Sequence, residues 1–372
     1  MSFIINAFRF AAAVVGWYSL ADGSNSDISD SPNVQSGGTW TIPSAWNGRR
    51  VRFSVSGSPA SDIYALKSGS SFMGAPRQIV DTIAGTLQQF NTAYSAPITV
   101  ATGETYTFTG RGTEANSSCG QVELLKSGVK CALVKRSSTF SIGTTLAAID
   151  WNDEEYDDAA FHDTGTNPSR LTIPSGTTGL FRVTANIEVN ASGGEIQMEL
   201  RINGTKANYT CPRIDNAANY LNLMTPPIAL TAGDYVEIFA LTTSASTLQA
   251  SNNSWFAIEE LESGLQYAIA GRSSNGAGMS ASTDTLQPMN SEVVDVGGWF
   301  TSGNSNFVVP SGVTAVRMGG QGSHGASSSG AWNMWIVKST GAYPGMGRGS
   351  AENAGTDNVC FGSAIKVVSS GD

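Results

Sequence analysis

The chain has 372 residues and a formal net charge of −9, and charged residues make up only 14% of it. This acidic balance excludes the basic footprint of a protein that binds nucleic acid or an anionic membrane surface. No apolar run is long enough to span a bilayer. The 42 glycines and the abundant serine and threonine favour all-β domains with many short strands.

The amino-terminal segment, residues 1–29, joins an apolar leader to a polar spacer. Arg9 lies inside the apolar part and no basic region precedes it, which argues against a secretion signal. A short apolar segment on a flexible spacer predicts a docking peptide, and the same pattern also fits an ordinary first strand. The candidate anchoring residues are Phe3, Ile4, Ile5, Asn6, Phe8, Arg9 and Phe10.

A short Pro-Ser phrase occurs three times in the rest of the chain, centred on Pro43, Pro174 and Pro310. The prolines are 131 and 136 residues apart, which is the size of a whole domain rather than of a solenoid repeat. Each phrase leads into an apolar run that contains one arginine. These arginines are Arg52, Arg182 and Arg317.

Two further markers keep the same spacing. Residues 97–106 resemble residues 227–235, and residues 122–128 resemble residues 258–264. The runs between them alternate apolar and polar side chains, which is typical of strands with one buried face. We therefore predict three similar all-β domains in tandem.

The predicted boundaries are residues 30–127 for domain 1, 133–262 for domain 2, 263–281 for a Gly/Ser linker and 282–372 for domain 3. Domain 3 ends at a Gly-Asp pair that aligns with Gly233-Asp234, after which domain 2 continues through two more strands. Domain 3 is therefore predicted to be truncated. Either the sequence is a fragment, which we favour, or something outside it supplies the closing strands.

Domain 2 carries a series of motifs in a fixed order. They are Trp-Asn-Asp-Glu-Glu-Tyr-Asp at 151–157, Phe-His-Asp at 161–163, Asn-Pro-Ser-Arg-Leu-Thr-Ile-Pro at 167–174, Ile-Asn-Gly at 202–204 and Leu-Thr-Ala-Gly-Asp-Tyr-Val at 230–236. This series resembles the bacteriophage branch of the trimeric jelly-roll family that includes the complement globular head and tumour necrosis factor. The leader Ile-Asn-Ala-Phe-Arg-Phe at 5–10 also resembles the amino terminus of phage fibre and surface proteins.

The resemblance implies that the three domains are antiparallel jelly-roll β-sandwiches. It also implies a homotrimer, in which an aromatic-rich sheet face of each protomer packs about a three-fold axis. Three copies of a tandem-domain chain would form a stiff appendage with raised avidity for a surface. Domains 1 and 3 lack the Trp-Asn motif, so they are assigned to this fold only because they repeat other markers of domain 2.

Residues that could carry chemistry are few. The two histidines, His162 and His324, have no motif that links them to a nucleophile, and His162 is expected to be a packed or hydrogen-bonding residue. An acidic run offers weak calcium candidates, Asp153, Glu155 and Asp157, but it lacks the order and glycine of a calcium loop. A carboxylate pair for glycoside cleavage is less favoured still, because contiguous acids on a loop point in several directions.

The remaining candidates have structural interpretations. The aromatics could stack on sugars, but filling cores or the trimer axis is the default; they are Trp151, Tyr156, Trp255, Trp299, Trp332 and Trp335. The cysteines show no metal-ligand spacing and are expected to be idle thiols; they are Cys119, Cys131, Cys211 and Cys360. No catalytic residue and no cofactor are predicted.

Three functions remain open. The favoured one is a non-enzymatic bacteriophage virion protein, a capsid decoration, head fibre or tail-associated fibre, assembled in the host cytoplasm and docked to capsid or tail proteins through the leader. The alternative is a tail fibre or tip that binds a host receptor or glycan. A secreted complement-like or cytokine-like ligand is disfavoured by the leader. No nucleic-acid partner and no membrane insertion are expected.

Overall fold

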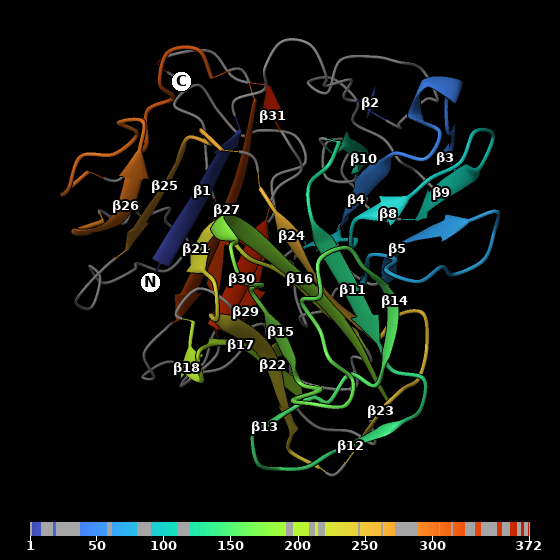
Figure 1. The fold of residues 1–372 in the computed structure, drawn as a ribbon. Helices are drawn as coiled ribbons and strands as arrows, with labels where there is room; N and C mark the ends of the chain where they lie inside the picture. The colour runs from blue at the N-terminus through green and yellow to red at the C-terminus, as the bar shows by residue number, and fades with distance from the viewer. Residues whose placement is uncertain are drawn as a thin grey trace.

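The structure is a computed structural model of the whole chain. It describes residues 2–8, 18–19, 38–57, 62–79, 91–109, 119–125, 127–190, 196–207, 213–214, 220–244, 246–261, 263–271, 289–304, 306–313, 315–323, 332–335, 348–351, 358–362, 366–367 and 371. Within these ranges the chain is built from antiparallel strands, with one 3-10 turn, η1 (Ser44–Trp46) (Figure 1). The prediction of an all-β protein made of antiparallel jelly-roll β-sandwiches is confirmed. None of the described segments is a helix able to cross a membrane.

Unit one, residues 18–125, has two sheets. Its strands are β2 (Tyr18–Ser19), β3 (Gly38–Thr41), β4 (Arg50–Gly57), β5 (Asp62–Lys67), β6 (Arg77–Ile79), β7 (Asn91–Tyr94), β8 (Ile98–Thr99), β9 (Thr105–Thr109) and β10 (Cys119–Leu124). One sheet has the order β2-β10-β4-β7, with β8 also on β4, and the other has the order β3-β9-β5-β6. Side chains of the two sheets, including Phe53 and Tyr106, form one buried core with Phe72 from the loop between β5 and β6.

Unit two, residues 131–260, is the largest. Its strands are β11 (Cys131–Lys135), β12 (Phe140–Ile142), β13 (Ala147–Ala148), β14 (Asp153–Asp157), β15 (Arg170–Thr172), β16 (Thr178–Asn190), β17 (Ile196–Ile202), β18 (Thr205–Lys206), β19 (Arg213–Ile214), β20 (Tyr220–Met224), β21 (Ile228–Thr231), β22 (Tyr235–Thr242), β23 (Ser246–Leu248) and β24 (Trp255–Glu260). One sheet runs β12-β23-β16-β24-β11-β14 and the other runs β13-β22-β17-β18. The predicted Asn203-Gly204 turn joins β17 to β18, and both residues have positive φ, as a tight hairpin turn requires.

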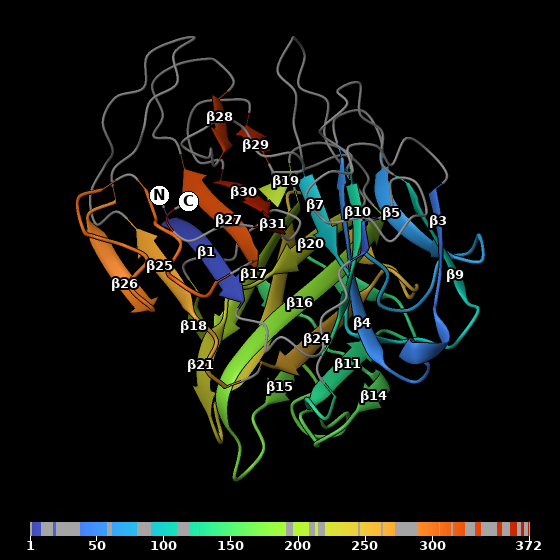
Figure 2. The ribbon, with the colours of Figure 1, turned by 90° about the horizontal axis from the view of Figure 1, so that it is seen from above.

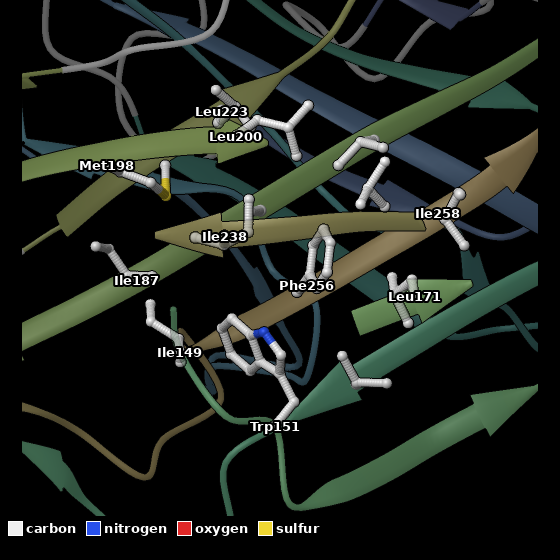
Figure 3. Packing of buried hydrophobic residues seen from close by; sticks show 14 of the residues in the cluster. Ile149, Trp151, Leu171, Ile187, Met198, Leu200, Leu223, Ile238, Phe256 and Ile258 are labelled. Atoms are coloured by element: carbon white, nitrogen blue, oxygen red, sulfur yellow. The ribbon is translucent and has the colours of Figure 1, made fainter. Parts of the chain in front are cut away.

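The core of unit two lies between its two sheets (Figure 3). The β16–β24 sheet contributes Ile187, Phe256 and Ile258, and the facing sheet contributes Met198, Leu200 and Ile238. Trp151 closes one end of this core and is fully buried. The sequence predicted that such aromatics fill cores. This holds for Trp151 in unit two and for Trp299 in unit three.

Unit three comprises residues 267–371 together with the amino-terminal strand. Its strands are β25 (Tyr267–Gly271), β26 (Ser291–Val296), β27 (Ala315–Ser323), β28 (Trp332–Trp335), β29 (Arg348–Ala351), β30 (Asn358–Gly362), β31 (Lys366–Val367) and β1 (Ser2–Phe8). The main sheet has the order β26-β25-β1-β27-β30, and β28 pairs with β29.

Two segments lie elsewhere than the sequence predicted. Strand β25 falls inside the range predicted as a Gly/Ser linker, residues 263–281, and pairs with both β1 and β26. Strand β1 falls inside the range predicted as an anchoring segment, and it is an inner strand of the unit-three sheet, between β25 and β27 (Figure 1). Composition misled in both places, because glycine-rich flanks and a polar spacer hide short apolar strands whose partners are distant in sequence.

The three units lie around a common centre. Seen from above, unit one in blue and cyan, unit two in green and yellow and unit three in orange and red fill three sectors (Figure 2). Strands β4, β16 and β27, which carry the repeated arginines, run on the side of each unit that faces the other two.

Candidate functional site

Five buried charged side chains meet where the three units come together. We call this group the axial cluster; it consists of Arg52, Glu123, Arg182, Glu259 and Arg317. The arginines are 0–1% exposed and the glutamates are 6% and 3% exposed. Charged side chains are rarely buried to this extent unless they are paired, so we expect each member of the cluster to have a partner of opposite charge.

The pairs of the axial cluster alternate in charge. Arg317 Nη2 lies 2.9 Å from Glu123 Oε2, and Arg52 Nη1 lies 3.2 Å from the same oxygen. Arg52 also pairs through Nη2 with Glu259, whose Oε1 lies 3.2 Å from Arg182 Nη1. The order Arg317, Glu123, Arg52, Glu259, Arg182 therefore links all three units through buried ion pairs.

Strand geometry explains why these side chains reach the centre. Arg182 stands opposite Glu259 in the pairing of β16 with β24, and Arg52 stands opposite Glu123 in the pairing of β4 with β10. Alternate side chains of a strand point to opposite faces. The side chains next to Arg182 therefore point into the unit-two core, and the Arg182 side chain points to the opposite face of β16. Both faces of β16 are consequently buried over much of its length.

Equivalent hydroxyls bind the arginine-bearing strands of units one and two. The Ser95 hydroxyl accepts a hydrogen bond from the Phe53 amide at 2.8 Å, and the Thr225 hydroxyl accepts one from the Val183 amide at 2.9 Å. Each amide belongs to the residue that follows the cluster arginine. The repeat therefore extends to individual buried hydrogen bonds that fix the arginine-bearing strands.

Burial and charge act in opposite directions on the acids. Burial alone would raise the pKa of Glu123, but attraction by Arg317, Arg52 and Arg182 outweighs it and lowers that pKa to about 2. For Arg182, burial and repulsion from Arg52 lower the pKa to about 9. Burial also acts to lower the pKa of Arg52, but Glu259 and Glu123 outweigh it and raise that pKa above its ordinary value.

We expect the folded state to lose stability as the pH falls from about 4.5 to about 2. The Glu123 carboxylate has a lower pKa in the folded chain than its ordinary value of 4.5, so its contribution is complete above that value and is lost on protonation. Urea midpoints measured across this range should fall for the wild type and fall less for Glu123→Gln. An equal fall in both proteins would show that other carboxyl groups, such as Asp158, dominate.

Units one and two also share a wide contact outside the axial cluster. The Trp255 indole donates to the Ala75 carbonyl at 3.1 Å. The Asn222 side chain accepts from the Tyr94 amide at 2.8 Å and donates to the Tyr94 carbonyl at 2.9 Å. An apolar cluster lies beside these bonds, made of Ala96, Leu133, Trp255 and Ala257 with Met73, Ile98 and Tyr156. The two units therefore pack as neighbours of fixed orientation.

Described residues of unit three also contact the other two units. The Arg317 guanidinium lies 5.3 Å from the centre of the Tyr94 ring, and its Nη1 lies 3.7 Å from Met224 Sδ. Tyr267 and Ile269 pack with Leu180 and Val294. Contacts from unit three thus reach both unit one and unit two.

His162 has the structural role expected for it. The side chain is buried, with Nδ1 2.9 Å from Glu154 Oε1 and Nε2 3.1 Å from the Pro168 carbonyl. The Asp157 carboxylate accepts from the His162 amide at 2.9 Å. These bonds fasten the loop that follows β14 and engage both ring nitrogens.

Two of the three calcium candidates share one ammonium group. Asp153, Glu155 and Asp157 lie on β14; Lys135 lies 2.7 Å from Glu155 and 3.8 Å from Asp153, while Asp157 binds backbone amides. Among the described residues no group of three His, Cys, Asp or Glu side chains could hold a metal ion. The acidic run forms an ordinary edge strand, which also gives no support to a glycosidase carboxylate pair.

Several other predicted residues can be placed in part. Cys131 is free and buried, and burial raises the pKa of its thiol to about 12, so it is an unreactive packing residue. For Phe3, Ile4, Ile5, Asn6 and Phe8 the structure describes the backbone pairing in β1. The candidates that lie outside the described residues are Arg9, Phe10, Cys211 and His324.

The sequence carries a signal for the axial cluster. Each repeat places one arginine within an apolar strand, and two repeats place a glutamate within an apolar closing strand. A charge at the same position of every copy, flanked by core residues, indicates a second buried face. Its pairing across units could not be read from spacing alone.

Similarity to known proteins is found among solved structures. No family model and no curated protein matches the chain. Among solved structures, murine APRIL at pH 8.5 is similar with a TM-score of 0.29 and 9% identity, over 36% of this chain and 99% of the APRIL chain. Murine APRIL at pH 5.0 is similar with a TM-score of 0.26, at the same identity and coverage. APRIL is a jelly roll of the tumour necrosis factor family.

Proposed function

We propose that this protein is a non-enzymatic structural component of a bacteriophage virion, exposed on the particle surface as a capsid decoration, head fibre or tail-associated fibre. The ordered motif series of domain 2, from Trp151 to Val236, is the observation that carries this proposal. The chemistry of the described residues agrees with a structural role. Their buried charges and His162 are engaged in contacts that hold units and loops together.

Attachment to the particle is the second part of the proposal. The leader is the candidate for docking to capsid or tail proteins, as its phage-like Ile-Asn-Ala-Phe-Arg-Phe sequence suggests. In the structure, residues 2–6 are paired with a strand on each side, and residues 7–8 are paired with β27. Docking would therefore use the unit-three sheet that contains β1, or it would require β1 to leave that sheet.

The test is localisation on particles. An antibody against the 38.8 kDa chain should label intact virions of the source phage at one recurring place in negative-stain images, and purified particles should contain the protein in stoichiometric amount. A protein found only in the soluble fraction of infected cells would overturn the proposal. Labelling confined to the tip of a tail fibre would favour the alternative, a host receptor- or glycan-binding protein.

A further inference from the structure

We infer that a single chain forms a complete three-fold assembly, in which its three units take the places that three copies take in a homotrimer. The inference goes beyond the proposed function and does not depend on it. It rests on three observations: the cyclic pairing of the axial cluster, the repetition of the contact between neighbouring units, and the position of β1 in unit three.

The axial cluster follows a rotation rule. Glu123 of unit one pairs with Arg52 of its own unit and with Arg317 of unit three. Glu259 of unit two pairs with Arg182 of its own unit and with Arg52 of unit one. Each glutamate thus joins its own arginine to that of the preceding unit, and this relation repeats only if the units are arranged cyclically.

Side chains beside the cluster obey the same rule. Tyr94 stands opposite Ser54 on β4, and Met224 stands opposite Thr184 on β16, two residues beyond the cluster arginine in each unit. Both equivalent side chains lie next to Arg317 of the third unit. The axis therefore passes between equivalent positions of units one and two and the arginine of unit three.

The contact between neighbouring units is repeated as well. Arg50, two residues before Arg52, stacks 4.2 Å from the centre of the Tyr156 ring of unit two. Leu180, two residues before Arg182, packs against the Tyr267 and Ile269 cluster of unit three, as Val294 does. Tyr156 and Val294 hold matching places, since they stand opposite Leu133 and Ile269 in the first strand pair of their units.

In unit three, β1 occupies the position that the closing strands β10 and β24 occupy in units one and two. In unit one β10 lies between β2 and β4, and in unit two β24 lies between β11 and β16. In unit three β1 lies between β25 and β27 in the same antiparallel sense. The register puts Asn6 opposite both Arg317 and Tyr267, as Glu259 stands opposite both Arg182 and Cys131.

Asn6 thus holds the place that a glutamate holds in the other two units. The corresponding glutamates, Glu123 and Glu259, each pair with the cluster arginine of their own unit and with that of a neighbouring unit. A glutamate at position 6 should therefore extend the same pattern to unit three. This gives the inference a gain-of-stability test.

The first test is the mass of the full chain in solution. Size-exclusion chromatography with light scattering should give the mass of one chain, 38.8 kDa. A mass about three times larger would overturn the inference and support the homotrimer that the family resemblance predicts. Because this measurement needs no virion, its outcome is separate from that of the particle test.

The second test asks whether the contacts are made within one chain. Asn252 Nδ2 of unit two donates to the Ser71 carbonyl of unit one at 3.1 Å, and both residues are exposed. After treatment with a short bismaleimide, the double variant Ser71→Cys with Asn252→Cys should run on a denaturing gel as a single internally linked chain. Each single variant serves as a control for the native cysteines. A ladder of dimers and trimers specific to the double variant would overturn the inference.

The third test is the variant Asn6→Glu, with Asn6→Gln as a matched neutral control. We expect Asn6→Glu to raise the melting temperature by about 2 °C or more, because position 6 stands opposite Arg317 in the strand pairing, as Glu123 stands opposite Arg52. Asn6→Gln should leave it unchanged or slightly lower. If Asn6→Glu were no more stable than Asn6→Gln, β1 would not be equivalent to the closing strands β10 and β24.

Discussion

Replacing Glu259 by Gln is expected to destabilise the folded chain by about 3–5 kcal/mol, the usual effect of removing one partner of a buried ion pair. Glu259 compensates both Arg52 and Arg182. Without its charge, Arg182 keeps the burial and the repulsion that already lower its pKa. Urea unfolding followed by tryptophan fluorescence would measure the change, since Trp255 lies on the same strand, β24.

The matched control is Glu260→Gln, at the next position of β24. Glu260 is only partly buried and points to the opposite face of the strand from Glu259. A surface substitution of this kind should change stability by less than about 0.5 kcal/mol. If the two variants lost stability equally, the axial cluster would have no special role in holding the units together.

Deleting residues 1–15 is expected to unfold unit three and to leave units one and two folded. The deletion removes β1, so β25 and β27 each lose one neighbouring strand, and two buried strand edges become exposed. Limited proteolysis followed by mass spectrometry should show new cleavage between residues 267 and 371 and a resistant core covering residues 38–260. Melting should change from one transition to two.

The same variant separates two roles of the leader. A purely anchoring segment would leave the fold intact on deletion and would abolish only the incorporation of the protein into particles. A closing strand would be needed for unit three itself. An unchanged protease pattern together with lost incorporation would contradict our assignment of β1 and support the docking peptide predicted from the sequence. Adding a synthetic peptide of residues 1–15 should restore protection if β1 is the closing strand.

Local patterns predicted most of what depends on neighbouring residues. Alternation gave the strands around Arg52 and Arg182, and the turn at Asn203-Gly204 followed from its residue types. The role of His162 was also predictable, because no nucleophile motif accompanied it. Each of these features is set within a few residues of chain, where backbone preference and side-chain spacing act directly.

The strand places of β1 and β25 were not predicted. Both are short apolar segments beside polar or glycine-rich stretches, so composition favoured a leader and a linker. β1 pairs with segments more than 250 residues away in the chain. A register over such a distance is selected by which sheet edge is available in the folded molecule, and periodicity carries no information about it.

By itself, the sequence determined that this protein is all-β, that it repeats one domain design three times, and that each copy holds an arginine within an apolar strand. The tertiary structure alone decided that these arginines meet in one buried cluster with Glu123 and Glu259. The physical reason is that the sequence of a strand shows which of its side chains alternate between faces, but it does not show which other strand packs against each face. A charge can be tolerated in an apolar strand only where another part of the chain brings the opposite charge to it.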